Sequence, residues 1–436
     1  MTDPTQPGDP AEEPDEGSTP GPAEGSGGGR NDPVPFPGLP FGPGGIDLSQ
    51  ILRMLQSPGP VNWEVARQVA AWVALEGGKE RAVDPNAQAQ FDELTRGALT
   101  IVVAETGLAA TYRASSRALG PKPWADLHLE ALRPVLEALA TKLGESMQAS
   151  DLSDLGLSDL GLPEAGSPAG EAGQNDPFGG LLGMMTPVLL GLQAGSMVGY
   201  LARHALGRYD LPLPTSDEPS VCFVVENIDA FEEAWSLPRD DLRFYVAIHE
   251  VVHAAERSVP WVRERIVRLA SEYVSAYEID PDALESRFGT INPQDPSSLG
   301  SLAEHPEELL GAMQTPAQQH VLAQLQTLTS VLEGYADTVL ERIGGRLIPS
   351  FDRIHEAMVR HRLERGEAER FVEGLLGLKL EQEHYERGAA FCAGVVERAG
   401  IEGLSRLWES DAMLPTVPEL EAPGLWLARI ELPVEH

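Results

Sequence analysis

Apolar residues recur at helical spacing over much of the chain. One stripe with steps of three and four residues begins at Val61, and the helical pattern continues to about residue 147. Similar patterns predict long helices over residues 261–277 and 317–343, and one or two more over 351–386. The pattern therefore favours a protein made mostly of helices.

The clearest strand signal lies at residues 221–226, where the sequence Val-Cys-Phe-Val-Val-Glu is rich in β-branched and aromatic residues. Because helical patterns far outnumber strand patterns, we expect a mainly α fold with a small β-sheet. The strand has two interpretations. It either covers a helix as a structural element, or it borders a cleft in which an extended peptide pairs with its edge.

Two segments interrupt the apolar pattern. Gly, Pro, Ser and Glu dominate the start of the chain, and such a composition buries too little apolar surface to order itself. We therefore expect residues 1–45 to form a disordered acidic tail and residues 46–430 to form one domain. A near repeat of Asp-Leu-Ser-Asp-Leu-Gly, followed by small residues and Pro, predicts a flexible insert at residues 150–177 within that domain.

Residues 178–202 contain no charged side chain, which raises the question of a membrane span. Pro187 and a string of glycines argue against one. Gly191, Gly195 and Gly199 are spaced at four residues, and small residues at that spacing let two helices approach closely. We expect a buried core helix here and no stable membrane insertion; a membrane-associated segment is the alternative.

The charge of the chain narrows the classes of partner. It has 32 Lys and Arg against 67 Asp and Glu, a formal net charge of −35, which disfavours binding to nucleic acid and to anionic membranes. The first residues carry neither a basic nor an apolar segment of the secretory type, so we expect a cytoplasmic location. Cys222 and Cys392 lie far apart and are expected to be buried small residues. The oligomeric state is left open.

A five-residue pattern, His-Glu-Val-Val-His at 249–253, lies within an apolar helical stretch. Residues four apart lie on one side of a helix, so His249 and His253 can bind one metal ion while Glu250 projects beside them. Zn²⁺ held by neutral imidazoles lowers the pKa of a bound water, and a neighbouring glutamate can accept its proton. We expect a zinc site with Glu250 as the general base. The alternative is a pair of buried structural histidines.

A third ligand is expected from the segment Glu-Gly-Tyr-Ala-Asp at 333–337. Glu333 and Asp337 are again four residues apart within a predicted helix, so both face the same way. If Glu333 binds the metal, Asp337 can accept the free ring N–H of a ligand histidine and orient it. The alternative interpretation of this pair is a solvated acidic helix face.

Further short segments follow these two motifs: Val-Pro-Trp at 259–261, Lys-Leu-Glu-Gln at 379–382, Tyr-Glu-Arg-Gly at 385–388 and Phe-Cys at 391–392. In combination, the motifs resemble the zincin-like metallopeptidase family of actinobacteria and related bacteria, which is often labelled as associated with deazaflavin coenzyme biosynthesis. The similarity covers about residues 45–430.

This resemblance implies a gluzincin-type metal site between helices, and the chain retains His249, His253 and Glu333 as its ligand set. At position 335 the family usually has His, whereas this chain has Tyr335. An acyl-transfer site also needs a donor for the developing oxyanion. Tyr385 and Arg387 are the first candidates, with His384 and His355 behind them, and none is assigned as catalytic.

Three functions are compatible with these patterns. The first is a zinc-dependent metallopeptidase that acts on a peptide or protein substrate. The second is a zinc-binding scaffold of the same fold without catalysis. The third is a zinc hydrolase of a small amide in coenzyme metabolism. We favour the first over the second because Glu250 is intact, and a purely structural metal site gains nothing from a base beside it.

Overall fold

The computed structural model describes six stretches of the chain, all within the compact unit Phe41–His436. The predicted tail at 1–45 and nearly all of the predicted insert at 150–177 lie outside the described residues. The described stretches are residues 59–108, 115–149, 177–214, 220–276, 316–363 and 381–431.

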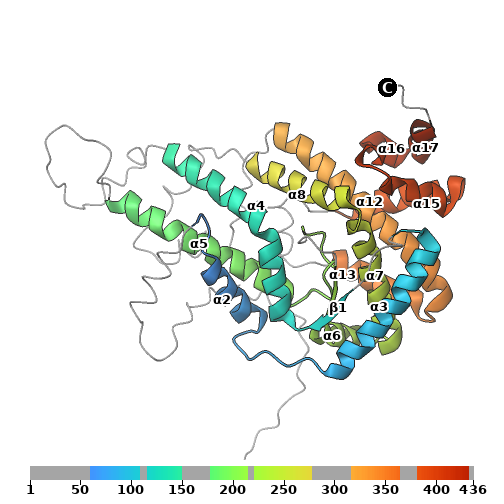
Figure 1. Ribbon diagram of the computed structural model, residues 1–436, viewed down its shortest axis with the longest axis horizontal. Coiled ribbons are helices and arrows are strands. Elements are labelled where there is room, and N and C mark those ends of the chain that lie inside the picture. Colours follow the sequence, from blue (N-terminus) through green and yellow to red (C-terminus); the bar gives the residue numbers. More distant parts are fainter. Residues whose placement is uncertain are drawn as a thin grey trace, which may run out of the picture. The chain divides into compact units, whose positions relative to one another are not determined.

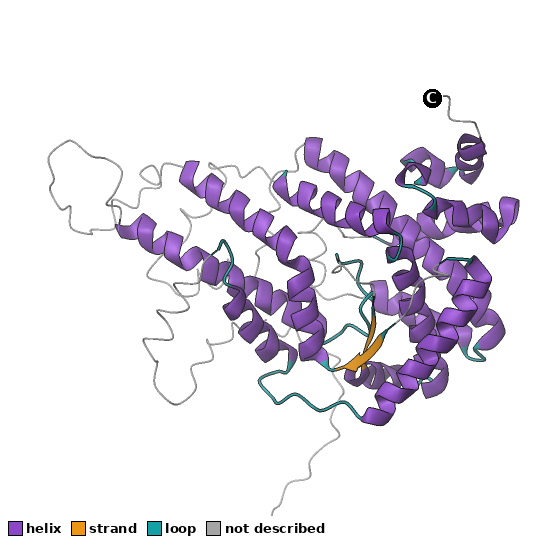
Figure 2. Cartoon of the chain, viewed as in Figure 1, coloured by secondary structure: helices purple, strands orange, loops and turns teal. Residues whose placement is uncertain are grey.

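The described part of the chain is mainly helical with one small sheet, as the sequence predicts (Figures 1 and 2). Two short 3₁₀ turns, Arg406–Trp408 and Asp411–Met413, precede the last two helices. The elements are α2 (Trp63–Ala74), α3 (Pro85–Thr106), β1 (Ser116–Leu119), α4 (Pro121–Ala149), α5 (Pro177–Ala202), β2 (Val221–Val224), α6 (Val225–Trp235), α7 (Arg239–Arg257), α8 (Pro260–Ser275), α12 (Pro316–Leu347), α13 (Phe351–Leu363), α15 (Gln382–Ser405), α16 (Val417–Glu421) and α17 (Pro423–Glu431).

The sheet consists of β1 and β2, which pair in parallel with Ser116 opposite Val221 and Leu119 opposite Val224. Strand β2 is the strand predicted from the sequence, and all four of its residues are buried. Strand β1 lies within a stretch that the pattern predicts to be helical, and there the prediction is wrong. Its sequence Ser-Arg-Ala-Leu has no strand preference of its own. Pairing with β2 determines its conformation.

Both edges of β2 are occupied. On one side lies β1, and on the other the N–H of Val224 donates to Leu206 O while Gly207 bridges Phe223. The strand therefore covers the interior as a structural element, the first of its two interpretations.

The outer edge of β1 is occupied by a side chain. The Gln88 amide of α3 accepts the N–H of Ala118 at 2.8 Å and donates to Ser116 O at 3.2 Å. One side chain thus supplies the acceptor and the donor that a neighbouring strand would supply.

Helix α5 packs closely on α2, as its glycine spacing predicts. A Cβ added at Gly191, Gly195 or Gly199 would collide with the α2 side of the interface, including the carbonyl oxygens of Ala66 and Ala70. Only glycine allows this approach. None of the helices in the described stretches is long and apolar enough to cross a membrane.

Helix α7 is packed against α3, α12 and α13, and every residue from Tyr245 to Arg257 is buried. It begins at Arg239, with Asp240 and Asp241 in its first turn, where negative charge favours the positive end of the helix dipole. From residue 244 to residue 255 the only charged side chain is Glu250, which is consistent with the burial of this part of the helix.

Helices α12 and α15 cross at two glycines. A Cβ at Gly334 would collide with the backbone of Gly388, and one at Gly388 would collide with Ser330 O. This crossing lies beside Glu333 and fixes the part of α12 that carries it. The helix continues to Leu347, a few residues beyond the predicted end at residue 343.

Candidate metal centre

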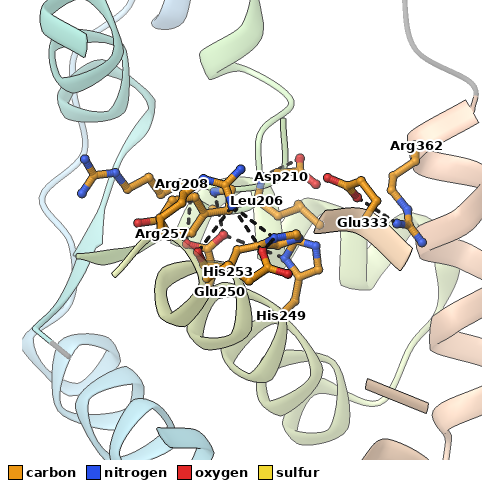
Figure 3. Close-up of polar contacts among 12 residues, drawn as sticks. Leu206, Arg208, Asp210, His249, Glu250, His253, Arg257, Glu333 and Arg362 are labelled. Atoms are coloured by element: carbon orange, nitrogen blue, oxygen red, sulfur yellow. Dashed lines mark hydrogen bonds and ion pairs between the residues drawn. The ribbon is translucent and has the colours of Figure 1, made fainter. Parts of the chain in front are cut away.

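The predicted histidine pair projects from one side of α7 (Figure 3). The side chains of His249 and His253 are buried, and their ring centroids lie 4.6 Å apart with the rings nearly perpendicular. The helix therefore brings the two imidazoles together as the spacing predicts.

The ring of His253 is held by Glu256, one turn later on α7. Glu256 Oε2 lies 2.7 Å and Arg257 Nη1 lies 3.3 Å from Nδ1 of His253. With the carboxylate ionised, Nδ1–H donates to Glu256 and the ring proton is on that side. Nη1 of Arg257 lies 3.5 Å from the same carboxylate oxygen. The other ring nitrogen, Nε2, is buried and has no hydrogen-bond partner in the described part of the chain. A buried, unprotonated imidazole nitrogen in this state is suited to bind a cation.

The carboxylate of Glu250 is hydrogen-bonded to the backbone of the segment that follows α5. Its two carboxylate oxygens accept the N–H groups of Arg208, at 2.9 Å, and Tyr209, at 2.8 Å. A Cβ on the preceding residue, Gly207, would collide with this carboxylate. Oε1 of Glu250 also lies 4.0 Å from Nδ1 of His249. Burial raises the pKa of Glu250 to about 8, although the backbone hydrogen bonds oppose the increase.

Glu333 and Asp337 face the same way on α12, and both contact Arg362 at the end of α13. Nη1 of Arg362 donates to Glu333 Oε2 at 3.2 Å, and Nη2 donates to both oxygens of Asp337 at 2.9 and 3.1 Å. The solvated acidic face considered for this pair is excluded, since the Glu333 side chain is 5% exposed and that of Asp337 15%.

We expected Asp337 to accept the ring N–H of a ligand histidine. In the structure the carboxylate of Asp337 pairs with Arg362 instead, and the carboxylate that contacts the His253 ring is that of Glu256. A second carboxylate, Asp210, accepts the N–H of Leu206 at 3.2 Å and lies 3.2 Å from Nε2 of His361.

Five carboxyl groups and three guanidinium groups lie around the histidine pair in the described part of the chain. Burial raises the pKa of Glu250 to about 8 and that of Glu256 well above its ordinary value, so the formal charges alone do not give the net charge of the centre. The observation that fits a bound divalent metal ion is the unpartnered Nε2 of His253. The groups are Asp210, Glu250, Glu256, Glu333 and Asp337, with Arg208, Arg257 and Arg362.

The candidate ligands are not gathered around one point. Among the described residues, no three His, Cys, Asp or Glu side chains are close enough together to hold a metal ion. Glu333 and Arg362 lie to one side of the two histidines in Figure 3. A third ligand from α12 therefore requires a change in the position of the Glu333 side chain.

The model of the zincin-like metallopeptidase family matches residues 61–427, which is most of the chain. The chain belongs to this zincin-like family. A solved structure from Chloroflexus aurantiacus, described as a candidate hydrolase with a novel fold, is 26% identical in sequence and superimposes with a TM-score of 0.57. The match covers 86% of this chain and 99% of that one. No curated protein matches the chain.

Tyr335 is the middle residue of the second motif, at the position where this chain departs from the resemblance. Tyr335 is fully buried, and its ring meets the ring of Trp408 edge-on with centroids 4.8 Å apart. This contact belongs to the packing between α12 and the C-terminal segment.

Of the four oxyanion candidates, Tyr385 packs against Arg362, whose guanidinium is 5.3 Å from its ring centroid. His355 lies 2.9 Å from the hydroxyl of Tyr245. His384 caps the start of α15, and Arg387 pairs with Glu383 on its surface. The last two therefore have structural contacts within α15, at the local spacings of three and four residues.

Five charged residues of the centre were not predicted from the sequence: Arg208, Asp210, Glu256, Arg257 and Arg362. Glu256 follows His253 by three residues, a spacing that places it on the same helix face, so helix geometry alone could have indicated it. Arg257 is its neighbour. Arg362 comes 25 residues after Asp337, and no local pattern connects the two.

Proposed function

We propose that the chain is a zinc-dependent metallopeptidase in which His249, His253 and Glu333 hold the ion and Glu250 is the general base. Membership of the zincin-like family supports a metal-dependent hydrolase, and the related structure is itself described as a candidate hydrolase. Bound zinc would activate a water molecule for attack on a carbonyl group. A peptide or protein is the proposed substrate.

The observation that carries this proposal is the state of His253. Its Nδ1 is held by Glu256, and its Nε2 is buried without a partner among the described residues. A histidine with only a structural role would leave this nitrogen unsatisfied, at a cost of about 1–3 kcal/mol. A bound metal ion removes that cost and uses the orientation that Glu256 imposes.

The backbone hydrogen bonds of Glu250 are compatible with the role of a base. Each carboxylate oxygen accepts one backbone N–H, and an oxygen with two lone pairs can accept a second hydrogen. A base works best when its pKa lies near the working pH, and burial raises the pKa of Glu250 to about 8. The backbone of Arg208 and Tyr209 would hold the carboxylate while it takes the proton.

The same backbone hydrogen bonds of Glu250 favour a second candidate, a zinc-binding scaffold. Glu250 joins α7 to the segment at Gly207, so its presence has a structural reason apart from catalysis. This weakens the sequence argument that an intact Glu250 implies chemistry. A third candidate, a hydrolase of a small amide, is favoured by β2, whose edges are both occupied and offer an extended peptide no place to pair.

A peptide-library cleavage assay on zinc-loaded protein separates the candidates. We expect cleavage by wild type, and a loss of about 100-fold or more in Glu250→Gln while its zinc content is kept. Glu383→Gln, the same change at an exposed position on α15, is the control and should cleave like wild type. Zinc-loaded wild type that cleaves no peptide would exclude the peptidase and leave the other two candidates.

A further inference from the structure

We infer that Trp124 of α4 is a positioning residue for Glu250: its indole N–H holds the peptide group whose opposite end binds the Glu250 carboxylate. The inference rests on the proposed function, because Glu250 is the group proposed as the general base. It does not depend on which side chain completes the metal centre.

The peptide group between Gly207 and Arg208 is hydrogen-bonded at both ends. The indole N–H of Trp124 donates to Gly207 O at 2.7 Å, and the N–H of Arg208 donates to Oε2 of Glu250 at 2.9 Å. The C=O and N–H of a planar trans peptide point in opposite directions. The segment therefore lies between α4 and α7, and a hydrogen bond to each helix fixes the plane of this one peptide.

The ring of His128 holds the indole of Trp124 from the next turn of α4. The two residues are four apart, and their rings stack with centroids 3.7 Å apart and planes inclined by 20°. Nδ1 of His128 lies 2.9 Å from Trp124 O, and Nε2 lies 3.3 Å from Arg208 O. A neutral imidazole has one N–H and donates to one of these carbonyls at a time, whereas the indole N–H is always a donor. The fixed donor of the pair is therefore Trp124.

Burial makes the contact of Trp124 with the peptide specific. The side chains of Trp124 and Glu250 are both fully buried, so solvent does not readily replace the indole as the donor to Gly207 O. A hydrogen bond to the C=O of a peptide also polarises its N–H, which strengthens the bond from Arg208 to the carboxylate. Without the indole N–H, we expect the peptide to turn towards another donor and to draw its N–H away from Glu250.

Other contacts hold the residues on either side of this peptide. Leu206 O accepts the N–H of Val224 from β2, and the N–H of Tyr209 donates to Oε1 of Glu250. A Cβ at Gly207 would collide with the Glu250 carboxylate, so the backbone lies as close to this side chain as glycine permits. At such close contact, a small rotation of the peptide moves the carboxylate. A displacement of about 1 Å can reduce a catalytic rate by about 100-fold.

NMR of selectively labelled protein tests the inference without a substrate. With ¹³C at the carbonyl carbons of glycine and ¹⁵N at arginine, only Gly-Arg peptide groups give a signal. The sequence has Gly207–Arg208 and two other such pairs, at 29–30 and 345–346. Glu250→Gln should shift one amide proton signal, which identifies Arg208. Trp124→Phe should move the same signal upfield, because its hydrogen bond to the carboxylate becomes weaker.

Trp426→Phe is the matched control. Trp426 is also fully buried, and its indole N–H also donates to a backbone carbonyl, that of Met413, at 2.6 Å. Both variants should be less stable than wild type in urea unfolding, but only Trp124→Phe should move the Arg208 signal. A signal that stays in place in Trp124→Phe, or that moves equally in Trp426→Phe, overturns the inference.

If Trp124→Phe folds poorly by circular dichroism, the reciprocal measurement carries the test. The chain has seven tryptophans, so ¹⁵N-tryptophan labelling gives seven indole N–H signals, and Phe variants of the others assign that of Trp124 by elimination. Glu250→Gln should shift this signal, because one peptide group links the indole to the carboxylate. An unchanged Trp124 signal overturns the inference.

Activity gives a further readout and separates the inference from the proposed function. In wild type that cleaves peptide, Trp124→Phe should lower kcat by about 10- to 100-fold with KM nearly unchanged, because only the base is displaced. In a Glu250→Gln background it should have no further effect on kcat. Zinc content should stay at the wild-type value. An unchanged kcat, or a loss of zinc, overturns the inference.

The outcomes for the two proposals are distinct. An Arg208 signal that shifts as expected, in a wild type that cleaves no peptide, refutes only the peptidase and leaves Trp124 as the residue that positions the Glu250 carboxylate. An Arg208 signal that does not move, in a wild type that cleaves peptide, refutes only the inference.

Discussion

Glu256 Oε2 lies 2.7 Å from Nδ1 of His253, and both side chains are fully buried within one turn of α7. A carboxylate in this position selects one tautomer of the ring and fixes its plane. The pair belongs to a single helix, so the orientation of His253 does not depend on how the helices pack.

The first prediction concerns this pair. Glu256→Gln removes the charge that holds the His253 proton on Nδ1, so Zn²⁺ affinity should fall by about 10-fold or more, as measured by chelator competition. Glu272→Gln, which changes an exposed carboxylate on α8, is the matched control and should bind Zn²⁺ normally. Equal affinity in Glu256→Gln and wild type would show that His253 needs no orienting partner.

The second prediction is a pH dependence that belongs to Glu250. Its folded-state pKa of about 8 lies above the ordinary value of 4.5, so the folded protein binds the extra proton between these two values. Stability of the zinc-free protein should therefore fall as the pH rises from 6.5 to 8, with a contribution of up to about 1.4 kcal/mol per pH unit from this group. Urea unfolding of wild type and Glu250→Gln across that range isolates the contribution. Parallel stability curves would contradict it.

The third prediction concerns His128, which is buried between Trp124 and the carbonyl oxygen of Arg208. Burial lowers its pKa to about 4, below the ordinary value of 6.5, so the unfolded chain binds the extra proton between these values. Its contribution should reduce stability as the pH falls from 6.5 to 4, by up to about 1.4 kcal/mol per unit. His128→Phe can keep a ring against Trp124 and should show a shallower acid loss in urea unfolding. An equally steep loss would assign the effect to other groups.

The fourth prediction compares two glycines on α12. Gly334→Ala places a methyl group against the backbone of Gly388, so it should destabilise the protein by about 1–3 kcal/mol or more. Gly345→Ala meets no atom within 4 Å and should stabilise by up to about 1 kcal/mol, because alanine favours the helix. Urea unfolding of both variants measures the difference. Similar effects at the two positions would mean that the crossing with α15 adjusts freely.

Local patterns predicted the parts of the site that one helix contains. The spacing of His249 and His253 was enough to bring their rings together, because helix geometry is independent of the rest of the fold. The glycine spacing of α5 likewise indicated a close helix contact, although it did not name α2 as the partner.

Contacts between distant segments were not predictable in this way. Strand β1 has no strand preference and exists because β2 lies beside it. Arg362 reaches Asp337 only after α13 has folded back on α12, so no spacing in the sequence connects them. The hydrogen bonds of the Glu250 carboxylate come from a segment more than 40 residues earlier in the chain. The ligand role of Glu333 stays a prediction.

The hydrogen bonds of Gln88 to β1 have a consequence for the behaviour of the protein in concentrated solution. An open strand edge can pair with the edge of another molecule and start a growing aggregate. The Gln88 amide takes the donor and acceptor positions that such a pairing would use at Ser116 and Ala118. In a two-stranded sheet both strands are edge strands, so the outer edge of β1 is protected from edge-to-edge association by a single side chain.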